Sequence, residues 1–115
     1  MKRVVVTGIG VVSCLGNNQE EVYKSFINSK SGITFSEEYK EFNLKSHVHG
    51  LPNIKLEDHV DRKVIRFMGK GSAYNYIAMN EAVKDSGLEE KDVSNISTGM
   101  VMGSGGPSIE NVILA

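Results

Sequence analysis

The chain has 115 residues, of which 40% are hydrophobic and 23% are charged, a composition typical of a soluble globular protein with one modest core. A formal net charge of −1 gives no general attraction to nucleic acid or to anionic membranes, so any charged partner must be recognised by a local patch. We expect no nucleic-acid partner and no membrane span. One cysteine excludes an internal disulfide and a four-cysteine zinc site, which favours a cytoplasmic protein. Glycines interrupt the N-terminal apolar run well before the length of a membrane span.

The N-terminal segment, residues 3–7, is apolar and β-branched without alternation, which is typical of a strand covered on both faces of an α/β sheet. The following sequence Gly8-Ile9-Gly10-Val11-Val12-Ser13 is similar to a dinucleotide-binding turn. The match is poor because Ser13 replaces the third glycine and the next helix starts late. We interpret the glycines as a tight structural turn, with a nucleotide site as the weaker alternative.

A first helix is predicted after Gly16, with Asn17 as its N-cap and Glu20 at its third position. Its end is predicted in the small polar run of residues 28–32. Apolar side chains recur at helical spacing, which predicts a buried inner stripe made of Val22, Tyr23, Phe26 and Ile27.

Residues 33–58 have a mixed pattern that predicts mostly loop, with one short extended piece at residues 47–50. His47 and His49 would share a strand face, but no cysteine or carboxylate cluster completes a metal set, so no metal is expected. Cys14 has no assignable activating neighbour. We therefore interpret it as a small buried cysteine rather than a nucleophile.

The segment from Asp61 to Lys70 predicts a helix with one basic face. At 100° per residue, Arg62, Lys63 and Arg66 fall within about one third of the circumference, joined by Lys70 if the helix continues past Gly69. A solvated face whose cations complement the helix C-terminus is one interpretation, and a docking site for an acidic protein is the other. The apolar side chains on the opposite side are predicted to be buried, and they are Val64, Ile65 and Met68.

The C-terminal part predicts a helix over residues 72–86 capped by Gly87, a second apolar strand over residues 98–102, and a glycine-rich loop over residues 103–108. A further helix starts at Ile109. The loop lacks the ending of a P-loop, and its spacing fits a substrate-pocket wall and a plain turn equally well. The order of elements predicts an α/β fold in a single partial domain, residues 1–115, with two parallel strands joined by a long crossover.

Several of these motifs together resemble the opening of the β-ketoacyl-(acyl carrier protein) synthases of the thiolase superfamily. They are residues 4–13, Leu15-Gly16-Asn17 and Ser31-Gly32-Ile33. A second group resembles the type I branch in particular, and it comprises Thr34-Phe35-Ser36, Ser46-His47-Val48, Asp61-Arg62-Lys63, Arg66-Phe67-Met68 and Gly103-Ser104-Gly105-Gly106.

The resemblance implies the N-terminal part of a thiolase-like fold, layered α/β with a mixed, partly parallel sheet, in a homodimeric enzyme without a cofactor. Relatives transfer an acyl chain to a cysteine and condense it with malonyl-(acyl carrier protein) in fatty-acid elongation, with two histidines stabilising the developing charge. These catalytic positions follow Ala115 in the family pattern. No residue of this chain is therefore assigned a catalytic role, and the chain alone is expected to be inactive.

The resemblance also implies two binding features. The docking of the acidic carrier protein is expected at Lys45, Arg62, Lys63 and Arg66, with Lys45 standing where arginine is usual. The wall of the acyl pocket is expected at Gly105, Gly106, Pro107 and Ser108, with Pro107 departing from the usual glycine. The alternative function is a non-catalytic module that binds carrier protein through the same basic helix.

Overall fold

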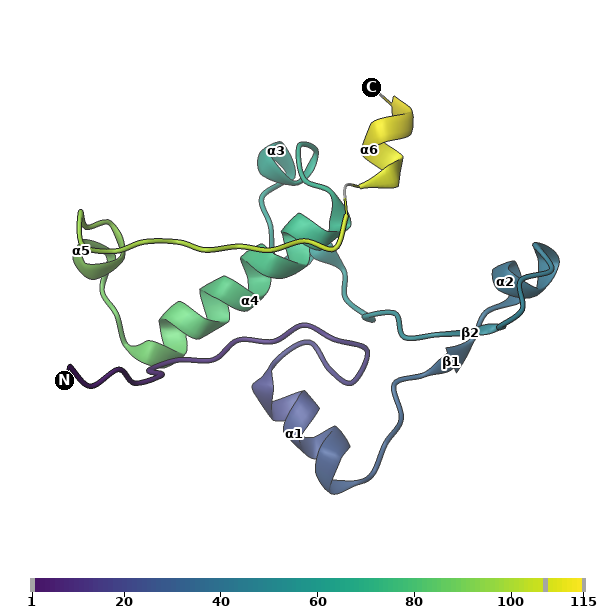
Figure 1. Cartoon of the computed structure of the whole chain (residues 1–115), viewed down its shortest axis with the longest axis horizontal. Helices are drawn as coiled ribbons and strands as arrows, with labels where there is room; N and C mark the ends of the chain where they lie inside the picture. The colour runs from purple at the N-terminus through teal and green to yellow at the C-terminus, as the bar shows by residue number, and fades with distance from the viewer. Residues whose placement is uncertain (1, 107, 115) are drawn as a thin grey trace. The chain divides into compact units, whose positions relative to one another are not determined.

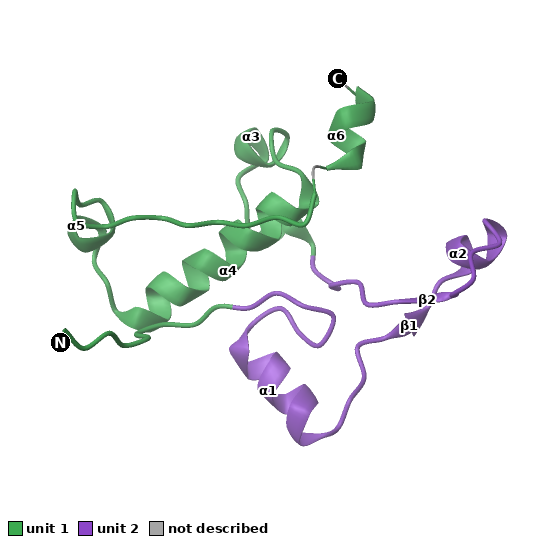
Figure 2. Cartoon of the chain, viewed as in Figure 1, with its two compact units in different colours: residues 1–10, 55–115 green, residues 11–54 purple. Residues whose placement is uncertain are grey.

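The structure is a computed structural model that describes residues 2–106 and 108–114. The chain divides into two compact units, one formed by residues 1–10 and 55–115 and the other by residues 11–54, coloured separately in Figure 2.

The first unit is built around α4 (Lys70–Ser86), the long helix in Figure 1. Its buried face consists of Ala73 and Ile77, which are 0% and 8% exposed. The helix ends at Gly87, whose φ of 70° lies in the left-handed region that glycine adopts without strain. The predicted helix and its glycine cap are confirmed.

Gly8 and Gly10 bring the N-terminal segment against the backbone of α4. A Cβ atom on Gly8 would overlap the carbonyl oxygen of Ala82, and one on Gly10 would overlap that of Ala78. The segment is held there by the Ile9 amide, which donates to Asp85 Oδ2 at 3.0 Å. The two glycines therefore permit a close backbone approach to a helix, which differs from the predicted turn.

The buried strand predicted for residues 3–7 is wrong for this structure. Val4 and Val6 are 94% and 82% exposed, and no strand is formed there. Residues 98–102 likewise form no strand, and Val101 is 96% exposed. A strand is held by hydrogen bonds to a neighbour, and neither segment is paired with another in the part of the chain that the structure describes.

Four short elements complete the first unit. They are a 3₁₀ turn η1 (Leu56–Asp58), α3 (Arg62–Ile65), α5 (Glu90–Val93) and α6 (Ile109–Leu114). Val60, between η1 and α3, is 4% exposed and belongs to the small core. The predicted start of a helix at Ile109 is confirmed, whereas α5 was not predicted from the sequence. Ala115, which that prediction included, lies outside the described residues.

The second unit begins with a tight turn in which Ser13 and Gly16 exchange backbone hydrogen bonds of 2.9 and 3.2 Å. Helix α1 (Gln19–Ile27) follows, and its N-cap is Asn18, whose side chain accepts from the Glu21 amide at 2.9 Å. The Glu21 carboxylate accepts in return from the Asn17 amide at 2.8 Å. The capping pattern was predicted one residue too early, because Asn17 instead completes the turn by donating to the Asn53 carbonyl.

The inner stripe predicted on α1 is also wrong for this structure. The buried residue of α1 is Ser25, whose hydroxyl donates to the Leu15 carbonyl at 2.6 Å. Val22 is half-buried. The aromatic and aliphatic side chains of the stripe are about two-thirds exposed, and they are Tyr23, Phe26 and Ile27.

The rest of the second unit is a hairpin in which β1 (Thr34–Phe35) pairs antiparallel with β2 (Val48–His49). The short helix α2 (Glu37–Glu41) lies between the two strands in sequence, capped by Ser36. The predicted extended piece at residues 47–50 is thus confirmed. This hairpin is the only sheet among the described residues, and the mixed layered sheet expected for the fold class is not formed by them.

Candidate functional site

The basic segment of the first unit folds as a helix of one turn. Asp61 caps α3, because its Oδ1 accepts from the Lys63 amide at 2.7 Å. Helix α3 ends at Ile65 with Arg66 as its C-cap, and Gly69 then precedes α4 in an extended conformation with φ −71° and ψ 158°. The helix does not continue through Gly69. The basic face is therefore limited to Arg62, Lys63 and Arg66.

All three cations of this face, hereafter the α3 basic face, are exposed. The Arg66 guanidinium lies over the ring of Phe67, with 4.9 Å between its central carbon and the ring centroid. On the opposite side of the helix, Ile65 and Met68 are half-buried but Val64 is 43% exposed. The predicted burial is thus wrong for Val64.

The three cations differ in pairing from several other basic residues. Four lysines form ion pairs with carboxylates, for example Lys24 with Glu20 at 2.6 Å. The hydrogen bond and charge of Lys24 lower the pKa of Glu20, and Glu20 raises the pKa of Lys24 for the same reasons. Among the described residues, no carboxylate pairs with any cation of the α3 basic face. Their charge is consequently available to a partner.

The other two basic positions considered from the sequence lie elsewhere. Lys70 opens α4 and pairs with Glu110 of α6 at 2.7 Å, so it does not extend the α3 basic face. Lys45 is exposed and follows α2 in the second unit, whereas α3 belongs to the first. Its predicted place in one docking site with α3 stays a prediction.

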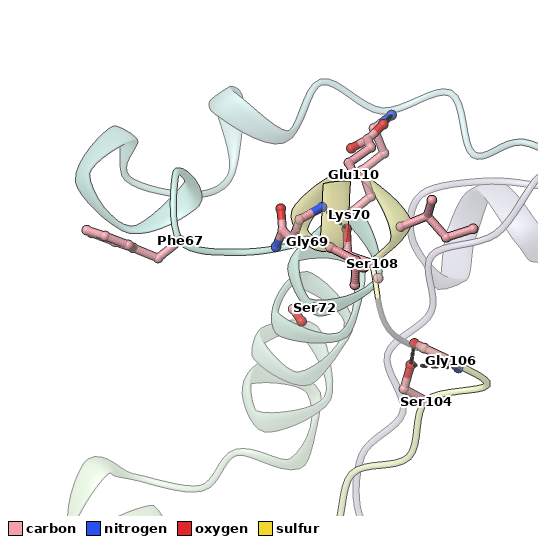
Figure 3. A pocket seen from close by; sticks show the side chains of 12 residues that line it. Phe67, Gly69, Lys70, Ser72, Ser104, Gly106, Ser108 and Glu110 are labelled. Atoms are coloured by element: carbon pink, nitrogen blue, oxygen red, sulfur yellow. Dashed lines mark hydrogen bonds and ion pairs between the residues drawn. The ribbon is translucent and has the colours of Figure 1, made fainter. Parts of the chain in front are cut away.

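The glycine-rich loop borders an open hollow of about 720 Å³ in the first unit. Gly106 and Ser108 line it, Gly105 is exposed in the same loop, and Pro107 lies outside the described residues. The Ser104 hydroxyl donates to the Gly106 carbonyl at 2.7 Å, which fixes the turn of the loop. Figure 3 shows Ser108 close to Gly69 and the Lys70–Glu110 pair, with Ser104 and Gly106 farther along the loop. The predicted role as an acyl-pocket wall stays a prediction.

The close approach of Gly69 to Ser108 joins the start of α4 to the start of α6. A Cβ on Gly69 would come within 2.7 Å of the Ser108 Cβ. This contact could not be predicted from the sequence, because the two residues are far apart in the chain and both have the pattern of a loop.

The three residues considered for metal or nucleophilic chemistry are engaged in packing. Cys14 is half-buried, with its sulfur against Gly50. His47 and His49 make edge-to-face contacts with the rings of Phe35 and Tyr39, at centroid distances of 6.0 and 5.4 Å. Within the described residues no group of three metal-ligating side chains occurs. A helix long and apolar enough to cross a membrane was likewise not found there.

Phe67 is the feature of the site that the sequence did not reveal. Its ring is 76% exposed beside the α3 basic face. Helical spacing could have indicated this exposure. At 100° per residue, Phe67 does not lie on the same side as Ile65 and Met68.

Comparison with known proteins connects this site to a family. The family model described as "Beta-ketoacyl synthase, N-terminal domain" matches residues 1–113. The chain is 48% identical over its whole length to "3-oxoacyl-[acyl-carrier-protein] synthase 1" of Haemophilus influenzae, and 48% identical over 94% of its length to the protein of that name from Escherichia coli K12. It is 33% identical over 99% of its length to "3-oxoacyl-[acyl-carrier-protein] synthase 2" of Staphylococcus aureus N315.

The chain spans about 28% of the length of these relatives, 27% for the Escherichia coli protein. The higher identity to the proteins named synthase 1 agrees with the motifs of the type I branch. On the match over nearly all of its residues, the chain belongs to the β-ketoacyl synthase family and corresponds to part of its N-terminal domain.

Proposed function

We propose that the chain is the N-terminal part of a 3-oxoacyl-(acyl carrier protein) synthase. The parent enzyme would condense an enzyme-bound acyl group with malonyl-(acyl carrier protein) and release carbon dioxide. The observation that carries the proposal is the family match over residues 1–113, together with 48% identity to two proteins that bear this activity in their names.

Within that reaction, we propose that the α3 basic face docks the acidic carrier protein. Three exposed cations that have no carboxylate partner among the described residues lie within five consecutive positions. Exposed cations of this kind steer an acidic protein and set its orientation, even though each pair contributes only about 0.2 to 1 kcal/mol. Lys45 is proposed as a fourth contact.

The chemistry itself is assigned to the part of the parent that this chain does not contain. In the family the acyl group is carried by a cysteine, and two histidines stabilise the charge that develops on the thioester oxygen and the enolate. Cys14 packs against Gly50, and the imidazoles of His47 and His49 contact aromatic rings. The 115-residue chain is accordingly expected to have no condensing activity alone.

The finer expectations for the fold belong to the same proposal. We propose that residues 3–7 and 98–102 become strands of a layered, partly parallel sheet within a single domain of a cytoplasmic homodimer. Their exposed β-branched side chains support this, because such residues are stabilised in paired and covered strands. Gly105, Gly106, Pro107 and Ser108 are proposed to form the wall of the acyl pocket.

A non-catalytic carrier-binding module is the second candidate. It is favoured by one observation: α3 is formed and capped entirely by residues 61–66 and needs no catalytic set to present its cations.

A condensation assay separates the two candidates. The full product of the encoding gene and the 115-residue chain are each incubated with acyl- and malonyl-(acyl carrier protein), and the 3-oxoacyl product is measured. The proposal predicts turnover by the full product and none by the 115-residue chain. A full product that binds carrier protein without turnover supports the binding module, and turnover by the 115-residue chain would contradict the assignment of the catalytic set.

A further inference from the structure

The contact between Arg66 and Phe67 distinguishes one cation of the α3 basic face from the other two. Arg66 caps the C-terminal end of α3, and the chain turns once more as the Phe67 amide donates to the Val64 carbonyl at 3.0 Å. The turn leaves the Phe67 ring 76% exposed and under the Arg66 guanidinium, 4.9 Å from its centroid. Figure 3 shows the ring directed away from the Lys70–Glu110 pair.

Such an arrangement has a physical effect on the arginine. A guanidinium over an aromatic face is attracted by the ring's quadrupole, and it can also stack on the ring through its planar group. Both interactions reduce the number of positions that the arginine side chain occupies. An exposed arginine otherwise loses considerable side-chain entropy when a partner immobilises it. Holding the guanidinium in place before binding reduces that loss.

We infer that Phe67 is a positioning residue of the docking face, which holds Arg66 ready for a bidentate contact with a carboxylate of the acidic carrier protein. The inference rests on the proposed docking function and deepens it. Arg62 and Lys63 have no aromatic contact among the described side chains, so Arg66 is the cation whose geometry the fold prepares. Aromatic residues and arginine are also the types that most often dominate the energy of protein interfaces.

The inference is tested by a double-mutant cycle in the full gene product, with the affinity for acyl carrier protein measured by calorimetry. Phe67→Leu keeps an apolar side chain and removes the ring, and it is combined with Arg66→Gln and, as the matched control, with Arg62→Gln. Phe67→Leu alone is expected to weaken binding about two- to fivefold, the range of an exposed cation–π contact. Phe67→Tyr, which keeps the ring, is expected to restore the affinity.

The cycle gives distinct outcomes for the positioning role and for the docking function. Positioning predicts that Phe67→Leu has no further effect beside Arg66→Gln but retains its full effect beside Arg62→Gln. An equal effect in both backgrounds, or no effect in either, would overturn the positioning role while leaving docking intact. If the Phe67→Leu product loses helical circular dichroism, Phe67 is a residue of the hydrophobic core, and this result would also overturn the positioning role. If Arg62→Gln and Arg66→Gln both leave the affinity unchanged, the docking function itself fails.

Discussion

Helices α3 and α4 lie in the same unit and are separated by a few residues, yet the chain uses them in opposite ways. Helix α4 has a face so closely covered that the carbonyl oxygens of Ala78 and Ala82 leave no room for a Cβ on Gly10 or Gly8. Helix α3 has one turn, a single capping side chain and three exposed cations. The distinctive feature of α4 is therefore its closely packed face, and that of α3 is its exposed cations.

The difference indicates which substitutions should affect folding and which should affect binding. An atom added to a close-packed contact forces the backbone to move, whereas replacing an exposed cation disturbs few packing contacts because solvent surrounds it. Substitutions at the covered face of α4 are therefore expected to lower the free energy of unfolding, and substitutions on the α3 basic face are expected to lower the affinity for a partner.

The largest effect is expected for Gly10→Val. The new side chain must displace either the N-terminal segment or α4, because the obstructing atom is a backbone oxygen. We expect the free energy of unfolding to fall by about 3 kcal/mol or more, measured by urea denaturation followed by circular dichroism.

Gly71→Ala is the matched control for that substitution. Gly71 lies in the first turn of α4, and a Cβ there would meet nothing within 4 Å. The alanine should stabilise the protein by up to about 1 kcal/mol, through the higher helix propensity of alanine and its smaller unfolded-state entropy. Similar destabilisation by both variants would show that glycine is needed along α4 for a reason other than close approach.

A smaller but still large effect is expected when a charge is placed on the covered face of α4. Ala73 is fully buried, so Ala73→Asp should lower the free energy of unfolding by several kcal/mol. Val64 is 43% exposed, and Val64→Asp should cost about 1 kcal/mol or less. Thermal denaturation of the two variants measures the contrast, and an equal loss in both would mean that α3 is packed like α4.

A modest effect is expected at the cap of α3. Asp61→Ala removes the acceptor for the Lys63 amide and should lower the stability of this turn by about 0.5 to 2 kcal/mol. Asp61→Asn keeps a capping oxygen while removing the negative charge beside the cations. It should preserve the helix and slightly strengthen carrier-protein binding, as measured by hydrogen exchange at residues 62–66 and by calorimetry. Weaker binding by Asp61→Asn would contradict an electrostatic role for the face.

The parts of this structure that followed from the sequence are those specified by neighbouring residues. Helix α4 with Gly87 and the basic turn after Asp61 depend on local spacing and caps, so their patterns were sufficient. The N-cap of α1 was predicted at Asn17 but lies at Asn18, because the Asn17 side chain has a distant partner, the Asn53 carbonyl. The strands predicted from Val4–Val6 and Val101 failed for a related reason, since a strand depends on a partner that its own residues do not specify.

In the candidate site, too, the features specified by neighbouring residues were predicted and those that depend on the path of the chain were not. The cations of α3 were identified from helical spacing alone, and their resemblance to docking positions in the family added a role. The stacking of Arg66 on Phe67 and the contact of Gly69 with Ser108 depend on how the chain turns after the helix, which no periodic pattern describes. Lys70, which was predicted as a possible member of the α3 basic face, instead pairs with Glu110, a residue 40 positions later.

The most direct test of the central claim is the affinity of Lys63→Glu with Arg66→Glu for acyl carrier protein, measured in the full gene product at two ionic strengths. The matched control is Lys84→Glu with Lys91→Glu, which changes the net charge equally at exposed positions outside α3. The docking account predicts a loss of about tenfold or more at low salt and a flatter salt dependence for the α3 pair, with little change in the control. Unchanged affinity and an unchanged salt slope for the α3 pair would show that the face is only solvated and would contradict the account.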